Sequence, residues 1–144
     1  MQTARDLLRE KGKRIYSTSP DATVYEALQL MAEKNVGALI VFEDERIVGL
    51  ISERDYARKI VLKNKFSRET AVAEIMTRDV LTVSPDKNLE ECMELITNHR
   101  VRHLPVVEDE RVIGIISIGD IVKGLIDHKQ FIIEQLEYYI KGWR

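Results

Sequence analysis

The sequence predicts an α/β (α+β) fold of two pseudo-symmetric strand–helix–strand–strand–helix repeats packed sheet to sheet, with an extra C-terminal helix. Three observations lead to this prediction. Residues 19–61 of the 144-residue chain align without a gap onto residues 84–126. Each copy contains short, β-branched apolar runs that are typical of buried strands. Each copy also has apolar residues at helical spacing, and two such copies together bury the sheet face that one copy leaves uncovered.

The alignment indicates a duplication, because identical residues recur in order throughout its length. The matched segments are Ser19-Pro20-Asp21 with Ser84-Pro85-Asp86, Glu43-Asp44-Glu45-Arg46 with Glu108-Asp109-Glu110-Arg111, and Gly49, Ile51, Ser52 and Asp55 with Gly114, Ile116, Ser117 and Asp120.

The elements follow in the same order in each copy. Ser-Pro-Asp ends a short strand and starts a helix, because Pro disfavours helical backbone before it and Asp suits a helix cap. The apolar runs 38–42 and 104–107 predict the next strand, and the acidic Glu-Asp-Glu-Arg segment predicts a hairpin turn. A further strand and then a Ser-x-x-Asp sequence, which opens the last helix, complete each copy.

The chain divides into repeat 1 (residues 3–62), a polar linker (63–73), repeat 2 (74–127) and a C-terminal helical extension (128–144). An amphipathic pattern runs from repeat 2 into the extension, with Gly142 as a possible stop. Its apolar positions are Ile121, Val122, Leu125, Ile126, Phe131, Ile132, Ile133, Leu136, Tyr139 and Ile140. We expect this helix to form a homodimer contact; a surface for another partner is the alternative.

Composition narrows the classes of function. A formal charge of −2 and a pI near 6.0 provide no basic field for nucleic acid as the main target. The single cysteine, Cys92, excludes an intrachain disulfide and lies on the apolar side of a helix. No apolar run approaches the roughly 20 residues that span a bilayer, and no signal peptide is evident, so we expect a cytoplasmic protein without membrane contact.

Several motifs now identify a family resemblance. The repeat resembles the cystathionine-β-synthase (CBS) domain, and the tandem pair resembles a Bateman module. The matching segments are Val-Gly-Ala-Leu-Ile-Val at 36–41, Val-Arg-His-Leu-Pro-Val at 101–106, Gly-Leu-Ile-Ser-Glu-Arg-Asp at 49–55, Gly-Ile-Ile-Ser-Ile-Gly-Asp at 114–120 and Glu-Ile-Met-Thr at 74–77. The resemblance covers about residues 3–127 and is specific, because the motifs occur in order and twice.

The Ser-x-x-Asp sequences are the strongest candidates for binding. A serine at a strand-to-helix junction caps the helix, and its hydroxyl and the nearby N–H groups can face an anion. The aspartate carboxylate can accept two hydrogen bonds, which suits the vicinal hydroxyls of a ribose. Residue chemistry alone leaves a second reading open, in which Ser and Asp serve only as a capping box.

The resemblance implies an adenine nucleotide in each cleft between the two copies. The first site would combine residues of both repeats, namely Ser117, Gly119 and Asp120 with the segment Thr18–Ala22 and with Val36, Gly37 and Ala38. The second site would combine Ser52 and Asp55 with Thr82, Val101, Arg102 and His103. Ile51 and Ile116 would sandwich the adenine ring. Arg54 and Arg102 are the best phosphate candidates, since guanidinium groups bind phosphate bidentately, although each also suits a surface ion pair. We interpret Arg58 and Lys123 as surface ion-pair partners, and His103 suits a phosphate contact or a backbone hydrogen bond equally.

The sequence does not support catalysis. It has no Cys-His or Ser-His arrangement with an orienting acid, and its three histidines form no metal-ligand set. We therefore expect a non-enzymatic regulatory module without a catalytic cofactor or metal, which binds AMP, ADP, ATP or NAD(H) as a regulatory ligand. It would act as an energy or redox sensor on an unknown regulated protein in trans. The alternative is a structural or scaffolding dimer with vestigial sites.

Overall fold

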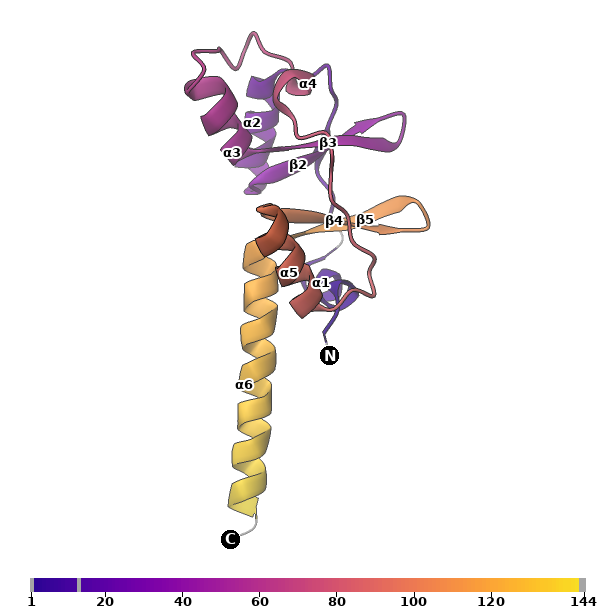
Figure 1. Ribbon diagram of the computed structural model, residues 1–144, viewed down its shortest axis with the longest axis vertical. Helices are drawn as coiled ribbons and strands as arrows, with labels where there is room; N and C mark the ends of the chain where they lie inside the picture. The colour runs from indigo at the N-terminus through magenta and orange to yellow at the C-terminus, as the bar shows by residue number, and fades with distance from the viewer. Residues whose placement is uncertain (1, 13, 143–144) are drawn as a thin grey trace. The chain divides into compact units, whose positions relative to one another are not determined.

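The computed structural model describes residues 2–12 and 14–142 and divides into two compact units. The repeat-1 unit comprises Ile15–Leu81, and the repeat-2 unit comprises Met1–Arg14 together with Thr82–Arg144. Helices and short sheets alternate in both units (Figure 1). The predicted mixed α/β class is therefore confirmed.

The repeat-1 unit contains a three-stranded sheet in the order β1-β2-β3. Its elements are β1 (Ser17–Thr18), α2 (Val24–Lys34), β2 (Ala38–Glu43), β3 (Arg46–Ser52), α3 (Glu53–Tyr56), the π-helical turn η1 (Ala57–Val61) and α4 (Val72–Ile75). The predicted hairpin turn lies between β2 and β3, where Asp44 and Glu45 have φ of 50° and 66°. Two consecutive positive φ values match the strand twist and produce a tight hairpin, to which Asp is suited.

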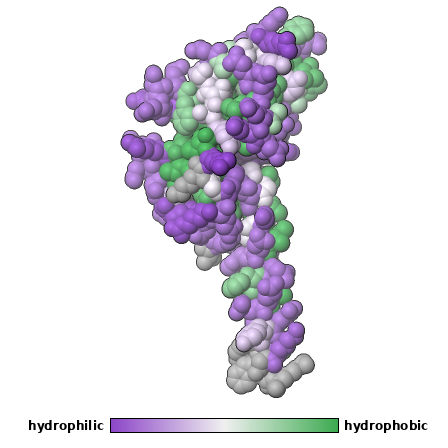
Figure 2. Space-filling model, turned by 180° about the vertical axis from the view of Figure 1, so that it is seen from behind, coloured by the Kyte–Doolittle hydropathy of each residue, from purple (hydrophilic) through white to green (hydrophobic). Residues whose placement is uncertain are grey.

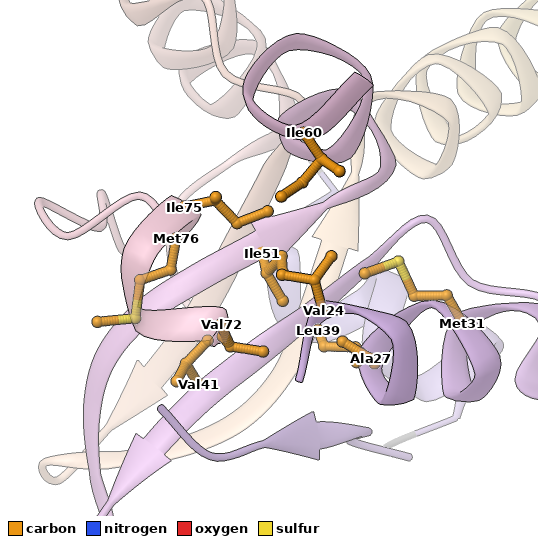
Figure 3. Packing of buried hydrophobic residues seen from close by; sticks show 10 residues of the cluster. All are labelled: Val24, Ala27, Met31, Leu39, Val41, Ile51, Ile60, Val72, Ile75 and Met76. Atoms are coloured by element: carbon orange, nitrogen blue, oxygen red, sulfur yellow. The ribbon is translucent and has the colours of Figure 1, made fainter. Parts of the chain in front are cut away.

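The core of the repeat-1 unit lies between the sheet and the helices α2, η1 and α4 (Figure 3). Ile51 on β3 lies near Val24 of α2 and Ile75 of α4, and all three are at most 1% exposed. The other members of the cluster are Ala27, Met31, Leu39, Val41, Ile60, Val72 and Met76. Burial of such aliphatic side chains stabilises each by about 1.5 to 3 kcal/mol, which fixes the end of β3 where the Ser-x-x-Asp sequence begins.

The repeat-2 unit repeats this plan with one strand fewer. Its elements are α1 (Ala4–Lys11), α5 (Leu89–His99), the hairpin strands β4 (His103–Glu108) and β5 (Arg111–Ser117), and α6 (Ile118–Gly142). The expected first strand is reduced to a single parallel bridge between Val83 and Val106. In the repeat-1 unit the Ile40 amide donates to the Tyr16 carbonyl, but the matching residue, Pro105, has no amide hydrogen.

The helix that precedes each repeat in the sequence packs in the unit of the other repeat, and we call α1 and α4 the exchanged helices. α1 packs in the repeat-2 unit, where the Ala4 amide donates to the Lys87 carbonyl at 2.8 Å. α4, from the segment between the repeats, makes the same bond in the repeat-1 unit, from Val72 to Ala22 at 2.8 Å. The compact units therefore begin at different residues from the repeats that the alignment defines.

Leu8 of α1 and Met76, the residue that directly follows α4, each lie over a hairpin glycine. A Cβ on Gly114 would lie 2.5 Å from the Leu8 side chain of α1, and a Cβ on Gly49 would lie 2.6 Å from the Met76 sulfur. Both glycines therefore allow a close approach of helix to strand, which explains why each copy has glycine at this position.

α6 runs without interruption from repeat 2 into the extension and continues well beyond the other elements of its unit (Figure 1). Ile121 is fully buried, whereas apolar residues farther along reach the surface (Figure 2). Of the predicted apolar positions, the side chain of Tyr139 lies outside the described residues. Among the helices in the described ranges, none is long and apolar enough to cross a membrane.

Candidate functional site

Both Ser-x-x-Asp sequences lie at a junction where the second hairpin strand passes directly into a helix. In the repeat-1 unit Ser52 is the N-cap of α3, and the Asp55 amide donates to its hydroxyl at 3.2 Å. In return, the Ser52 amide and hydroxyl donate to Asp55 Oδ2 at 3.0 and 3.1 Å. This is a complete capping box, and it fixes both side chains at the helix start.

The repeat-2 unit has the same junction between β5 and α6. The Ser117 amide donates to Asp120 Oδ2 at 2.8 Å, and the Asp120 amide donates to the Ser117 hydroxyl at 3.1 Å. The predicted helix starts are thus confirmed, and the capping role of both residue pairs is present. In each unit the carboxylate remains partly accessible, with side-chain exposures of 13% for Asp55 and 27% for Asp120.

The start of the first hairpin strand lies beside each junction. Ala38 pairs with Ser52, and His103 pairs with Ser117, in the antiparallel registers of the two hairpins. The carbonyl just before each strand accepts a hydrogen bond from the first residue of the helix. These bonds run from Glu53 to Gly37 at 3.1 Å and from Ile118 to Arg102 at 2.8 Å.

A lysine ammonium group neutralises each aspartate. Lys59 Nζ lies 3.2 Å from Asp55 Oδ1 and also donates to the Ile75 carbonyl at 2.8 Å. Lys11 Nζ lies 2.6 Å from Asp120 Oδ2 and donates to the Ile115 carbonyl at 2.9 Å. Burial raises the pKa of Asp120, but hydrogen bonds from Lys11 and Ser117 and the charge of Lys11 hold that pKa below its ordinary value.

The two lysines come from different parts of the chain. Lys59 is four residues after Asp55 on the same helical segment, whereas Lys11 is on α1. The residue four after Asp120 is Gly124, where a Cβ would lie 2.7 Å from Leu89 and 2.9 Å from Leu7. The close packing of α1 and α5 against α6 therefore leaves no room for a lysine there, and α1 supplies the cation instead.

Sequence reasoning missed both lysines. The i,i+4 spacing of Asp55 and Lys59 is a local signal that could have found the first pair. Lys11 precedes Asp120 by 109 residues, so no local spacing connects them.

The remaining predicted site residues lie at or near the strand ends of their own units. Ile51 and Ile116 are both 0% exposed, so an adenine ring could reach them only after neighbouring side chains move. Thr82, Arg102 and Gly119 are exposed, while Thr18, Ala22, Val36, Arg54 and Val101 are half-buried. The grouping of residues from both repeats into one binding site stays a prediction.

The other potentially reactive side chains among the described residues form no metal-binding cluster and include no activated thiol. Over residues 2–12 and 14–142, no group of three or more His, Cys, Asp or Glu side chains could hold a metal ion. Cys92 is buried, and that burial raises the pKa of its thiol to about 11. A thiol with such a pKa is not a nucleophile near neutral pH.

Two similar units, each with a capped Ser-x-x-Asp junction, define a tandem-repeat α/β module. The family model of the CBS domain matches residues 4–62 and 72–127. The chain therefore belongs to the CBS-domain family, as a tandem pair.

Known proteins extend this assignment. The chain is 38% identical over 150 residues to the CBS domain-containing protein CBSX3, mitochondrial, of Arabidopsis thaliana, covering 97% of this chain and 72% of that protein. It is 46% identical to a putative signal-transduction protein with CBS domains from Burkholderia ambifaria, with a TM-score of 0.85 over 88% of this chain and 95% of the other. The CBS domain pair of protein MJ0100, solved with 5′-methylthioadenosine and S-adenosyl-L-methionine, is 25% identical, with a TM-score of 0.76 over 86% and 99% of the two chains. CBS modules generally bind adenosine-containing ligands, and stand-alone CBS proteins are generally regulatory and not catalytic.

Proposed function

We propose that this chain is a regulatory module of the cytoplasm that binds adenine nucleotides, AMP, ADP, ATP or NAD(H), and acts on a partner protein in trans. The observation that carries the proposal is the pair of Ser-x-x-Asp junctions. Each combines a helix N-terminus with a partly accessible carboxylate. The N-terminus attracts anionic phosphate, and the carboxylate accepts ribose hydroxyls. The adenosine compounds bound to the MJ0100 pair support the same ligand class.

The two proposed sites differ in charge. Following the resemblance, Ser117, Gly119 and Asp120 act with Thr18, Ala22 and the strand start at 36–38, whereas Ser52, Arg54 and Asp55 act with Thr82 and the strand start at 101–103. Arg54 and Arg102 both fall in the second group. We therefore propose that phosphate-rich nucleotides favour the Asp55 site, because guanidinium groups bind phosphate bidentately.

Binding is tested by thermal denaturation and calorimetry with AMP, ATP and NADH. A ligand at about 100 times its Kd stabilises the fold by about 2.7 kcal/mol, which is visible as a higher Tm. Asp55→Ala and Asp120→Ala should each weaken one site by roughly 10- to 150-fold, since a hydrogen bond to a charged group contributes about 1.5 to 3 kcal/mol. Unchanged affinity with a lower Tm would show that these aspartates only cap helices.

The second candidate function is a structural dimer whose nucleotide sites are vestigial. The capping boxes and the lysine ion pairs favour it, because they already satisfy the carboxylates without any ligand. In that case no adenine nucleotide would change the Tm, whereas any clear stabilisation by AMP, ATP or NADH would exclude it.

We also propose that the protein is a homodimer and that α6 supplies the contact. An apolar stripe runs along α6 at spacings of three, four and seven residues and is 39–59% exposed; it comprises Ile118, Val122, Ile126, Ile133, Leu136 and Ile140. Covering such side chains in a second α6 stabilises each by up to about 1.5 to 3 kcal/mol.

Sedimentation of the full chain and of a chain truncated after Asp127 tests the dimer. The truncated protein should be monomeric and should still bind nucleotide. Leu136→Glu should also weaken the dimer, whereas Gln135→Glu, an exposed polar position on the side of the helix away from the stripe, should not. A monomeric full-length chain would refute this part of the proposal.

A further inference from the structure

Lys11 occupies the carboxylate that the proposed function assigns to the ribose. Its ammonium group and the Ser117 amide both donate to Asp120 Oδ2, at 2.6 and 2.8 Å. An oxygen that accepts two such bonds has no lone pair left for a ligand hydroxyl. A ribose that engages both oxygens of Asp120 must therefore displace Lys11.

Displacement of Lys11 would affect the end of α1. Lys11 is the last residue of α1, and the chain passes from the repeat-2 unit into the repeat-1 unit after Arg14. The helix ends at Gly12, whose amide donates to the Leu8 carbonyl at 2.9 Å and whose φ of 94° suits glycine. The Lys11 ion pair thus holds the final turn of α1 directly before the connection between the two units.

The other end of α1 is fixed independently of Asp120. Leu7 and Leu8 are 5% and 1% exposed, and Arg5 forms an ion pair with Glu108 of the hairpin. Loss of the Lys11 contact would therefore loosen only the last turn, while the start of α1 stays in place.

The repeat-1 unit provides a contrast. Lys59 lies on the same helical segment as Asp55, so that ion pair joins two residues of one segment, and Lys59 also donates to the Ile75 carbonyl of α4. In the repeat-2 unit the ion pair itself joins the aspartate to α1, a separate helix that precedes the passage of the chain into the repeat-1 unit.

We propose that Lys11 is a positioning residue that couples nucleotide binding at Asp120 to the connection between the two units. Without ligand, Lys11 holds Asp120 and the final turn of α1 is ordered. Ribose hydroxyls replace the ammonium group on the carboxylate, and the final turn of α1 is released. The ligand thereby selects between two states of the final turn of α1, in proportion to its different affinity for them. This inference rests on the proposed function.

The test compares Lys11→Met with the wild-type lysine by calorimetry, in an Asp55→Ala background so that the Asp120 site is measured alone. The probes are AMP and 5′-methylthioadenosine, which has the ribose hydroxyls but no phosphate. Removing the competing ammonium should tighten both ligands about two- to fivefold, the range expected for a partly exposed ion pair. With 2′,3′-dideoxyadenosine, which lacks both hydroxyls, the variant should bind as the wild type does.

Hydrogen exchange at the Gly12 amide supplies the second readout. AMP should accelerate its exchange in the protein with Lys11, whereas in Lys11→Met this exchange should be fast already and should not respond. Lys123→Met removes the same charge from exposed α6, three residues after Asp120, and should retain the wild-type response.

Three outcomes overturn the inference. Weaker AMP binding by Lys11→Met, with 5′-methylthioadenosine unaffected, would make Lys11 a phosphate ligand. Unchanged affinity for both ligands would separate Lys11 from the site while leaving nucleotide binding intact. Failure of the wild type to bind either ligand would instead refute the proposed function, and this inference with it.

Discussion

The two units apply one local design in two ways. Each ends its hairpin in a Ser-Asp capping box and places a lysine on the aspartate. In the repeat-1 unit the lysine is one helical turn away, so the pair forms whenever the helix forms. In the repeat-2 unit Gly124 holds that position and the lysine comes from α1, so the pair forms only when α1 is docked.

The helices that follow the junctions differ as well. α3 continues into the π-helical turn η1, which buries Ile60 and ends at Val61, whereas α6 continues for 25 residues. The same capping motif therefore starts two different helices. In the repeat-1 unit the helix packs on the core of its own unit, and in the repeat-2 unit α6 continues beyond the other elements of its unit. A helix start is a local property, but helix length depends on the residues that follow.

The largest expected effect on the free energy of unfolding comes from Leu8 of α1 and from Met76, which directly follows α4. Leu8→Ala should destabilise the repeat-2 unit by about 2 to 5 kcal/mol, because it leaves a cavity over Gly114. Met76→Ala should do the same in the repeat-1 unit over Gly49. Hydrogen exchange resolves the two: Leu8→Ala should deprotect β5 amides, and Met76→Ala should deprotect β3 amides. Faster hydrogen exchange of β3 amides in Leu8→Ala would contradict the packing of α1 in the repeat-2 unit.

The hairpin glycines offer a second comparison. Gly49→Ala should cost about 1 to 3 kcal/mol, because its Cβ would meet both the Met76 side chain and the Thr77 carbonyl, the latter at 3.0 Å. Gly114→Ala should cost less, since the nearest atoms all belong to the flexible Leu8 side chain. Urea denaturation of the two variants measures the difference, and equal losses would show that the backbone carbonyl is irrelevant.

Position 27 and position 92 are equivalent in the repeats, with Ala27 1% and Cys92 0% exposed. Cys92→Ala makes the two helices alike at this position and should cost about 1 kcal/mol in the free energy of unfolding, since only one buried sulfur is removed. The native Cys92 thiol should also resist thiol reagents until the protein unfolds, because burial raises its pKa to about 11. Rapid labelling of the native protein would contradict the buried position.

The smallest expected effect is on acid stability. The pKa of Asp120 is lower in the folded chain than its ordinary value of 3.8, so its stabilising contribution is present above that value and is lost as the pH falls through the folded pKa. Lys11→Met should therefore lower stability by about 0.2 to 1 kcal/mol near neutral pH. The difference in Tm between wild type and variant should stay constant above about pH 5 and shrink as the pH falls below the ordinary value of 3.8. A difference that stays constant with pH would assign the effect to the Ile115 carbonyl contact.

Some features of the fold were predictable because their causes are local. The hairpin turns at Asp44-Glu45 and Asp109-Glu110 and the caps at Ser52 and Ser117 depend on residues within four positions of one another. The loss of the first strand in repeat 2 was also open to prediction, since Pro105 lacks the amide hydrogen that Ile40 uses. The role of Ile51 was harder to predict from the sequence, because a β-branched residue at the end of a strand can either line a ligand site or belong to the hydrophobic core.

The sequence by itself determined the duplication, the order of the elements and the two Ser-Asp junctions, because periodicity, turn chemistry and capping act over a few residues. Only the tertiary structure decided that α1 packs with the second repeat, that Leu8 covers Gly114 and that Lys11 reaches Asp120. The Leu8–Gly114 and Lys11–Asp120 contacts join residues more than 100 positions apart, and no local preference encodes them. They form because burying Leu7 and Leu8 outweighs the entropy of closing so long a loop, a cost that rises only slowly with length.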